Sequence, residues 1–290
     1  MKQQLSVFVK VVELKSFSRA AEDLYMTQPA VSQYIQSLEQ VIGMRLLERT
    51  NKIISLTRAG EIVYVKGKEI LNLYGRMQRL LEDLSNDVNG EISIGASYTY
   101  GEYQLPHIIA KMKELYPNIT PNITIANTKE ILEMVNNYSL DIGIIEGEIR
   151  KQREIKIVHF AEDTLNIVAA PDYHLPNDTV SIKDLEKEMW IVREHGSGTR
   201  EATEKLFQKL NINPALKMEF GSTQVIKESV EAGLGIALLS RSVFQKEEKL
   251  KTLKVITPEE FYVKRNFSYA IKNSFQTKAV EVLISLLEEV

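Results

Sequence analysis

Residues 17–40 read FSRAAEDLYMTQPAVSQYIQSLEQ, and this stretch decides how the N-terminal part of the chain folds. Ser18 is a good N-cap for a short helix over 19–24. Thr27 is a good N-cap for a longer helix that runs to about Val41. Pro29 lies in the first turn of that helix, where its missing N–H costs nothing. The stretch therefore predicts two helices joined by a tight turn.

The two faces of the second helix differ sharply in polarity. Its apolar side chains recur at helical spacing, as do those of an earlier helix expected over 3–14. The opposite face carries short polar and amide side chains, namely Gln28, Ser32, Gln33 and Gln36. Glutamine can pair with adenine through two hydrogen bonds, and serine can meet base edges or phosphates. The pattern predicts a helix-turn-helix over 18–37 whose second helix enters the major groove of DNA.

A short hairpin is expected directly after these helices. Residues 46–49 and 53–56 read as strands around a turn at 50–52. Arg49 and Lys52 are placed to reach DNA phosphates from this hairpin. Thr57 then caps a new helix that begins at Arg58. Residues 1–60 are thus expected to form a DNA-binding domain of the winged helix-turn-helix type.

The N-terminal sequence resembles the head of LysR-type transcriptional regulators. The resemblance rests on residues 17–24, 27–35, 38–39, 43, 46–49 and 56–60. It departs mildly at Leu47, where the family usually has Phe, and at Lys52, where it often has Arg. The resemblance implies groove contacts from Thr27, Gln28, Pro29, Ser32 and Gln33, and backbone contacts from Arg49 and Lys52. The alternative for Thr27 and Pro29 is that they only begin a helix.

The distribution of charge agrees with DNA contact at one end of the chain. The 290 residues carry a net charge of −3, but residues 1–60 carry eight lysines and arginines against five acidic residues. A basic head on an acidic body confines nucleic-acid contact to the head. There is no cysteine, which excludes disulfides and thiolate metal sites. No apolar run approaches the roughly 20 residues that span a bilayer, so we expect a cytoplasmic protein without membrane contact.

A long helix over 58–88 is expected to link the head to the rest of the chain. Apolar residues recur along it at alternating spacings of three and four, which is a heptad seam. The expected dimerisation residues are Val63, Ile70, Leu73, Met77, Leu80 and Leu84. The seam could instead pack against the chain's own body. The family resemblance implies antiparallel pairing of two such helices, so that a homodimer or homotetramer reads an interrupted inverted repeat in double-stranded DNA.

Beyond a polar turn at 86–90, strand patterns alternate with helical patterns in two sets. This alternation predicts α/β units with largely parallel sheets, and two sets indicate two subdomains. Strands are expected over 156–160 and 165–169, on either side of a crossover. The resemblance implies a periplasmic-binding-protein-like effector domain over 89–290, with subdomain I over 91–161 and 267–290 and subdomain II over 162–266. The whole chain is therefore expected to be α/β with an N-terminal all-α winged helix-turn-helix.

Three polar loops are candidates for binding an effector between these subdomains. The expected residues are Ser97, Tyr98, Thr99, Thr128, Gly196, Ser197, Gly198 and Thr199. The last four follow a strand and open a helix, where backbone N–H groups and the helix dipole favour an anion. We therefore expect a small anionic effector such as a carboxylate, sulfate or phosphate. Glu146 opposes an anion unless it is paired, and each loop could instead be only a cap or a tight turn.

Other classes of protein fit the sequence less well. Neither a Gly-x-Ser-x-Gly elbow nor a phosphate-binding loop is present, and the four histidines lack metal-ligand spacing. We therefore expect no catalytic residue, no metal and no cofactor. A transport binding protein would need a signal peptide, whereas the N-terminus reads as an amphipathic helix. A DNA-binding protein without an effector stays open, as do the effector's identity, activation against repression, and contact with RNA polymerase.

Overall fold

Side-chain caps begin three helices of the N-terminal unit, Met1–Glu82, which start at Phe17, Gln28 and Arg58. The computed structural model describes residues 1–50, 53–84, 88–149, 153–173, 182–256 and 261–289. The N-terminal unit holds α1 (Lys2–Leu14), α2 (Phe17–Asp23), α3 (Gln28–Ile42), β1 (Leu47–Thr50), β2 (Ile53–Leu56) and α4 (Arg58–Glu82). The hydroxyl of Thr27 accepts a hydrogen bond from the N–H of Ala30, 3.4 Å away, which confirms its predicted role as the cap of α3.

The predicted cap of α2 was wrong by two residues. Ser16, not Ser18, has the extended backbone of an N-cap, and its hydroxyl accepts from the N–H of Arg19 at 3.2 Å. Helix α2 therefore begins at Phe17. Either serine could cap a helix by composition, and the left-handed turn at Lys15 that ends α1 selects Ser16.

The three short helices and the wing enclose one apolar core. Its fully buried members include Phe8, Val31, Ile35, Leu38 and Leu46. The wing strands β1 and β2 pair antiparallel, as the sequence predicted. Gly60, in the first turn of α4, lies so close to this core that an added Cβ would be 2.0 Å from the carbonyl oxygen of Leu46. The wing and the start of α4 are thus packed against the helix-turn-helix.

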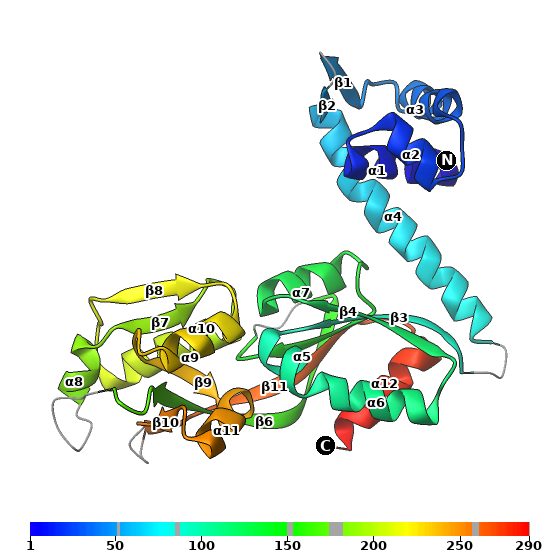
Figure 1. Ribbon diagram of the computed structural model, residues 1–290. Coiled ribbons are helices and arrows are strands. Elements are labelled where there is room, and N and C mark those ends of the chain that lie inside the picture. Colours follow the sequence, from blue (N-terminus) through cyan, green and yellow to red (C-terminus); the bar gives the residue numbers. More distant parts are fainter. Residues whose placement is uncertain (51–52, 85–87, 150–152, 174–181, 257–260, 290) are drawn as a thin grey trace. The chain divides into compact units, whose positions relative to one another are not determined.

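The second unit, Asp83–Val290, contains strands flanked by helices (Figure 1). Its N-terminal part comprises β3 (Gly90–Ala96), α5 (Tyr98–Tyr103), α6 (Leu105–Leu115), β4 (Ile119–Ile125), α7 (Thr128–Asn136), β5 (Ile142–Glu146) and β6 (Ile155–Ala169). Its middle part comprises α8 (Ile182–Lys187), β7 (Trp190–Arg193), α9 (Gly198–Leu210), β8 (Lys217–Phe220), α10 (Thr223–Glu231), β9 (Ala237–Ser240), α11 (Arg241–Leu250) and β10 (Lys254–Val255). The chain closes with β11 (Val263–Lys272) and α12 (Lys278–Glu288).

The main sheet is mixed, so the expectation of largely parallel sheets was wrong. Strand β3 pairs parallel with β4 and β5, and β7 pairs parallel with β8. Strands β6 and β11 pair antiparallel with each other, and β5, β9 and β10 join them antiparallel as well. This unit has two halves: a first half around β3, β4 and β5, and a second half around β7, β8 and β9. The chain passes between them along the strands β6 and β11 and not through crossover helices, which explains the antiparallel pairing.

Strand β6 runs unbroken where the sequence predicted two strands. Residues 155–169 form one strand, and residues 155–165 of it pair with β11, with a register shift only between Phe267 and Ser268. The expected crossovers at 161–162 and 265–266 therefore lie inside paired strands. Figure 1 shows β6 and β11 extending from one half of the unit into the other. The two halves are joined by a hydrogen-bonded ribbon.

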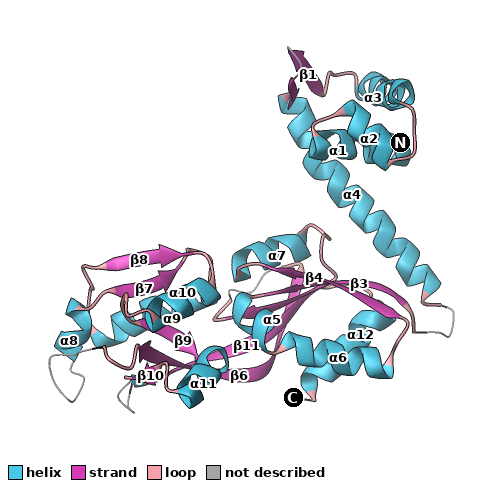
Figure 2. Cartoon of the chain, viewed as in Figure 1, coloured by secondary structure: helices cyan, strands magenta, loops and turns pink. Residues whose placement is uncertain are grey.

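Separate apolar cores identify the two halves. The core of the first half contains Ile94, Ile144 and Leu283, with α6 and α12 on one face of the sheet and α7 on the other (Figure 2). The core of the second half is built around Trp190, whose ring meets Phe207 edge-on, at a centroid distance of 4.7 Å. Figure 2 also shows α5 and α11, which the sequence pattern did not predict.

Candidate functional site

The polar face of α3 is available for contact. Thr27, Gln28, Pro29, Gln33 and Gln36 are exposed, and Ser32 is half-buried. The amide of Gln28 donates to the hydroxyl of Ser32 at 3.1 Å, so neighbouring members of this face are hydrogen-bonded to each other. All six predicted groove residues thus lie on, or directly before, one helix. Lys52 lies outside the described residues, and the side chain of Arg49 is also outside them.

An exposed apolar strip runs along α4. Ile70, Leu73 and Met77 are 55%, 48% and 45% exposed, which is unusual for large apolar side chains. Leu84, also exposed, follows the end of the helix, and Leu80 is half-buried. Val63, the remaining predicted residue, is half-buried and packs against the core of the N-terminal unit. In that part of the helix the exposed apolar side chains belong instead to Ile62 and Val65.

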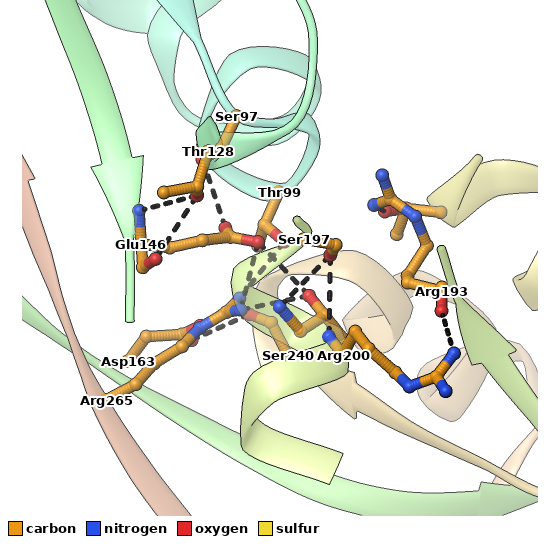
Figure 3. Close-up of polar contacts among 12 residues, drawn as sticks. Ser97, Thr99, Thr128, Glu146, Asp163, Arg193, Ser197, Arg200, Ser240 and Arg265 are labelled. Atoms are coloured by element: carbon orange, nitrogen blue, oxygen red, sulfur yellow. Dashed lines mark hydrogen bonds and ion pairs between the residues drawn. The ribbon is translucent and has the colours of Figure 1, made fainter. Parts of the chain in front are cut away.

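In the second unit, hydroxyl groups from both halves converge on the carboxylate of Glu146 (Figure 3). Ser97, the N-cap of α5, donates to Oε2 of Glu146 at 3.1 Å. Thr199, in the first turn of α9, donates to Oε1 at 3.1 Å. Thr128 binds the backbone of the same residue, donating to its carbonyl oxygen at 3.2 Å. The loops chosen from the sequence therefore do meet, but around an internal carboxylate.

The positive partner of Glu146 is Arg265 of β11. Their Oε1 and Nη1 atoms are 3.0 Å apart, and the two side chains are 1% and 3% exposed. Arg265 also binds Asp163 of β6, with Nε 2.7 Å from Oδ2. Its remaining N–H groups donate to Thr99 at 3.0 Å and to Thr199 at 2.9 Å. Burial raises the pKa of Asp163, an effect that the charge of Arg265 opposes.

The glycine-rich loop before α9 has two structural roles. The hydroxyl of Ser197 caps α9, accepting from the N–H of Thr199 at 3.2 Å. Gly198 lies so close to Glu146 that an added Cβ would be 2.3 Å from its carbonyl oxygen. Gly196 has a φ of 97°, and its carbonyl oxygen accepts from the N–H of Lys129 in the first half at 3.2 Å. The loop thus holds the two halves in contact.

A second ion pair at this junction was not predicted from the sequence. Arg193, at the end of β7, is 1% exposed and binds the neighbouring carboxylate of Glu194. Its guanidinium lies 4.3 Å from the centre of the Tyr98 ring, which comes from the first half. Arg265 and Asp163 were also missed. Charged residues within strands that are otherwise apolar were the available signal, because such charges are buried only with a partner.

A cavity of about 200 Å³ lies beside the Arg265 cluster. Its walls include Gly147, Gly198, Ala202, Lys205 and the start of β11. Drug-sized ligands occupy pockets of about 300–1,000 Å³, so this smaller cavity suits a molecule smaller than a typical drug. Within the described part of the chain, no three His, Asp or Glu side chains cluster in a way that could hold a metal ion. None of the described helices is long and apolar enough to cross a bilayer.

Comparisons with known proteins agree along the whole chain. Residues 3–61 match the family described as "Bacterial regulatory helix-turn-helix protein, lysR family", and residues 85–290 match "LysR substrate binding domain". The HTH-type transcriptional regulator CysL of Bacillus subtilis is 36% identical over 287 residues, covering 98% of this chain and 95% of CysL.

Solved structures show the same fold. The superposition with full-length CbnR, determined in complex with its target DNA, covers 100% of this chain and 99% of the CbnR chain, with a TM-score of 0.74 at 22% identity. The regulatory domain of CcmR from Synechocystis PCC6803, in complex with 2-PG, covers 69% of this chain and 97% of its own. Its TM-score is 0.63 at 25% identity.

Proposed function

Because the chain belongs to the LysR family of DNA-binding transcription regulators, we propose that a small anion bound between the halves of its effector domain changes how it binds DNA. One observation carries this proposal. The same chain carries a head whose helix α3 has an exposed polar face and a domain in which buried polar groups from two halves converge. We propose that the protein acts in the cytoplasm and catalyses no reaction.

In the proposed DNA complex, the polar face of α3 reads base edges in the major groove. Gln28, Ser32, Gln33 and Gln36 offer hydrogen-bonding groups on that face, and Thr27 and Pro29 bring the start of the helix to the groove. Arg49 and Lys52 serve as phosphate contacts, which add affinity without selecting a sequence.

The proposed assembly is a homodimer or homotetramer that pairs through α4. The exposed side chains of Ile70, Leu73 and Met77 support this arrangement, because an apolar strip of this length is stable when a second helix covers it. Two heads at a fixed separation would read an interrupted inverted repeat.

The proposed effector site is the junction formed by residues 97–99, Thr128 and residues 196–199. Support comes from the helix N-terminus of α9 and from the hydroxyls gathered there. The CcmR regulatory domain was determined in complex with 2-PG, so a similar domain accommodates a small molecule, which supports the proposal. Glu146 does not repel such a ligand at full strength, because Arg265 neutralises it.

DNA binding by the full chain tests the head. Duplexes recovered by selection from a random library are titrated in fluorescence anisotropy, against scrambled duplexes of equal length. We expect Gln33→Ala to reduce the discrimination between them by about 1–3 kcal/mol. Gln40→Ala is the matched control, because Gln40 is exposed on the same side of α3 but lies about two turns further toward the end of the helix; it should leave discrimination unchanged. An equal loss on both duplexes would show that Gln33 does not read bases.

The sensing role is tested with the same duplexes. Sulfate, phosphate, 2-PG and a set of small carboxylates are added in turn, and both the anisotropy titration and the melting temperature of the protein are recorded. At least one anion should raise the melting temperature and change DNA affinity. If none changes either quantity, the protein is a DNA-binding regulator without an anionic effector.

A further inference from the structure

The end of β7 presents an arginine fork toward the first half of the effector domain. Arg193 Nε and Nη2 donate to the two carboxylate oxygens of Glu194, at 2.7 and 2.8 Å. Its Nη1 donates to the hydroxyl of Thr223, in the first turn of α10, at 2.7 Å. The ring of Tyr98 covers the guanidinium from the first half. Both the position and the orientation of this fork are therefore fixed by its neighbours.

A third donor comes from the other side of the junction. The amide Nδ2 of Asn127, which caps α7 in the first half, lies 3.3 Å from Oε1 of Glu194. Both carboxylate oxygens of Glu194 are thus held by the second half, and one of them by the first half as well. A planar fork with an added amide donor matches a carboxylate, sulfate or phosphate equally well.

Glu194 differs from the other carboxylates at the junction in how easily it can leave. Glu146 and Asp163 are 1% and 5% exposed, and their departure from Arg265 would strand buried charges. Glu194 is 23% exposed. Although burial opposes it, Arg193 lowers the pKa of Glu194 below its ordinary value, so this carboxylate is an anion at neutral pH. It can rotate into water still charged, without a desolvation cost.

We propose that the carboxylate of Glu194 is a built-in substitute for the oxyanion group of the effector, which displaces it from Arg193 and Asn127. The ligand class is a small molecule carrying a carboxylate, sulfate or phosphate group. Because its donors come from both halves, the bound anion joins them directly. This inference rests on the proposed function, since it specifies where the anionic group binds.

Removal of the internal carboxylate from the full-length protein tests the proposal. Glu194→Ala and Glu194→Gln are titrated with sodium sulfate, sodium phosphate and 2-PG by calorimetry and by melting temperature. We expect at least one of these anions to bind Glu194→Ala at least tenfold more tightly than the wild type, and to raise its melting temperature more. Adding Arg193→Gln to Glu194→Ala should abolish that gain. Glu204→Ala is the matched control, because it removes a carboxylate from Arg200, 2.7 Å away, on the exposed side of α9.

The outcomes separate this inference from the proposed function. Unchanged anion affinity in both Glu194 variants, or a gain that survives Arg193→Gln or also appears in Glu204→Ala, overturns the inference. If, in that case, a metabolite still changes DNA binding by the wild type, the sensing function stands and its anion site lies elsewhere. If the gain depends on Arg193 but no anion changes DNA binding, the site is supported and the sensing function fails. Fluorescence of the buried Trp190 verifies that each variant is folded.

Discussion

Replacing Arg265 with methionine should destabilise the effector domain strongly at neutral pH and weakly at acid pH. Arg265 is the cation between Glu146 and Asp163, at 3.0 and 2.7 Å, and all three side chains are at least 95% buried. Methionine has a comparable length and no charge. In the variant, two buried carboxylates would face each other without a counter-ion.

The size of the effect follows from the proton that the variant must take up. A carboxyl group has an ordinary pKa of about 3.9, and holding it protonated costs about 1.4 kcal/mol for each pH unit above that value. Keeping one of the two carboxyls neutral therefore costs about 4 kcal/mol at pH 7 and about 1.5 kcal/mol at pH 5. The figure at pH 7 agrees with the roughly 3–5 kcal/mol lost when one partner of a buried ion pair is removed.

The stability of the Arg265→Met variant should depend on pH. In the variant, one of the two carboxyls takes up a proton, and the pKa of that carboxyl is higher in the folded state than in the unfolded state. The folded state then binds more protons than the unfolded state, so stability falls as pH rises from about 4 to 7 and returns as pH falls. In the wild type, burial already raises the pKa of Asp163, but Arg265 opposes this rise.

Urea unfolding followed through Trp190, the single tryptophan of the chain, measures this effect in the effector domain. Arg200→Met is the matched control, since Arg200 pairs with the half-exposed carboxylates of Glu204 and Glu219. It should cost about 1 kcal/mol or less at either pH. Adding Asp163→Asn to Arg265→Met should recover most of the loss. A loss below about 1 kcal/mol at pH 7, or an equal loss at pH 5 and pH 7, would refute the reasoning.

Three further perturbations address other parts of the structure. Tyr100→Phe should leave the free energy of unfolding unchanged or raise it by up to about 1–3 kcal/mol in the same urea assay, because its buried hydroxyl makes no hydrogen bond; a loss above 1 kcal/mol would reveal a partner for it. Gly198→Ala should cost about 1–3 kcal/mol, since its Cβ would collide with Glu146, while Gly221→Ala meets no atom within 4 Å and serves as the comparison. Leu73→Glu should convert the oligomer to monomers in light scattering, and an unchanged mass would exclude this part of α4 from the interface.

Much of the N-terminal unit could be predicted from the sequence. The extents of α1 and α3, the wing and the start of α4 depend on contacts between residues a few positions apart. The Thr27 cap is one such contact, and the antiparallel pairing of β1 with β2 is another. Short-range caps and helical periodicity are written in the order of the residues, so they can be read before the fold is known. Where two serines could both serve as a cap, the preceding turn at Lys15 decided between them.

The effector domain was less predictable because its decisive contacts join distant residues. Strand β6 was expected as two pieces, and only its partner β11, about a hundred positions away, makes it one strand. Short helix α5 has only six residues and no apolar periodicity to announce it. A reader of the sequence could place polar loops at strand ends, but not the ribbon that joins the halves.

For the candidate effector site, the sequence by itself determined which loops carry the polar groups, and the tertiary structure decided what those groups bind. Ser97 and Thr199 are 49 and 53 positions from Glu146 in the sequence, and Arg265 donates to Thr99, which is 166 positions away. Hydrogen bonds of that range depend on how distant segments pack, within the first half for Ser97 and between the halves for Thr199 and Arg265, which no local pattern encodes. From the sequence, these hydrogen-bond donors looked like a site for an external anion. In the folded chain they bind the carboxylate of Glu146, because a buried charge must be paired wherever the fold places it.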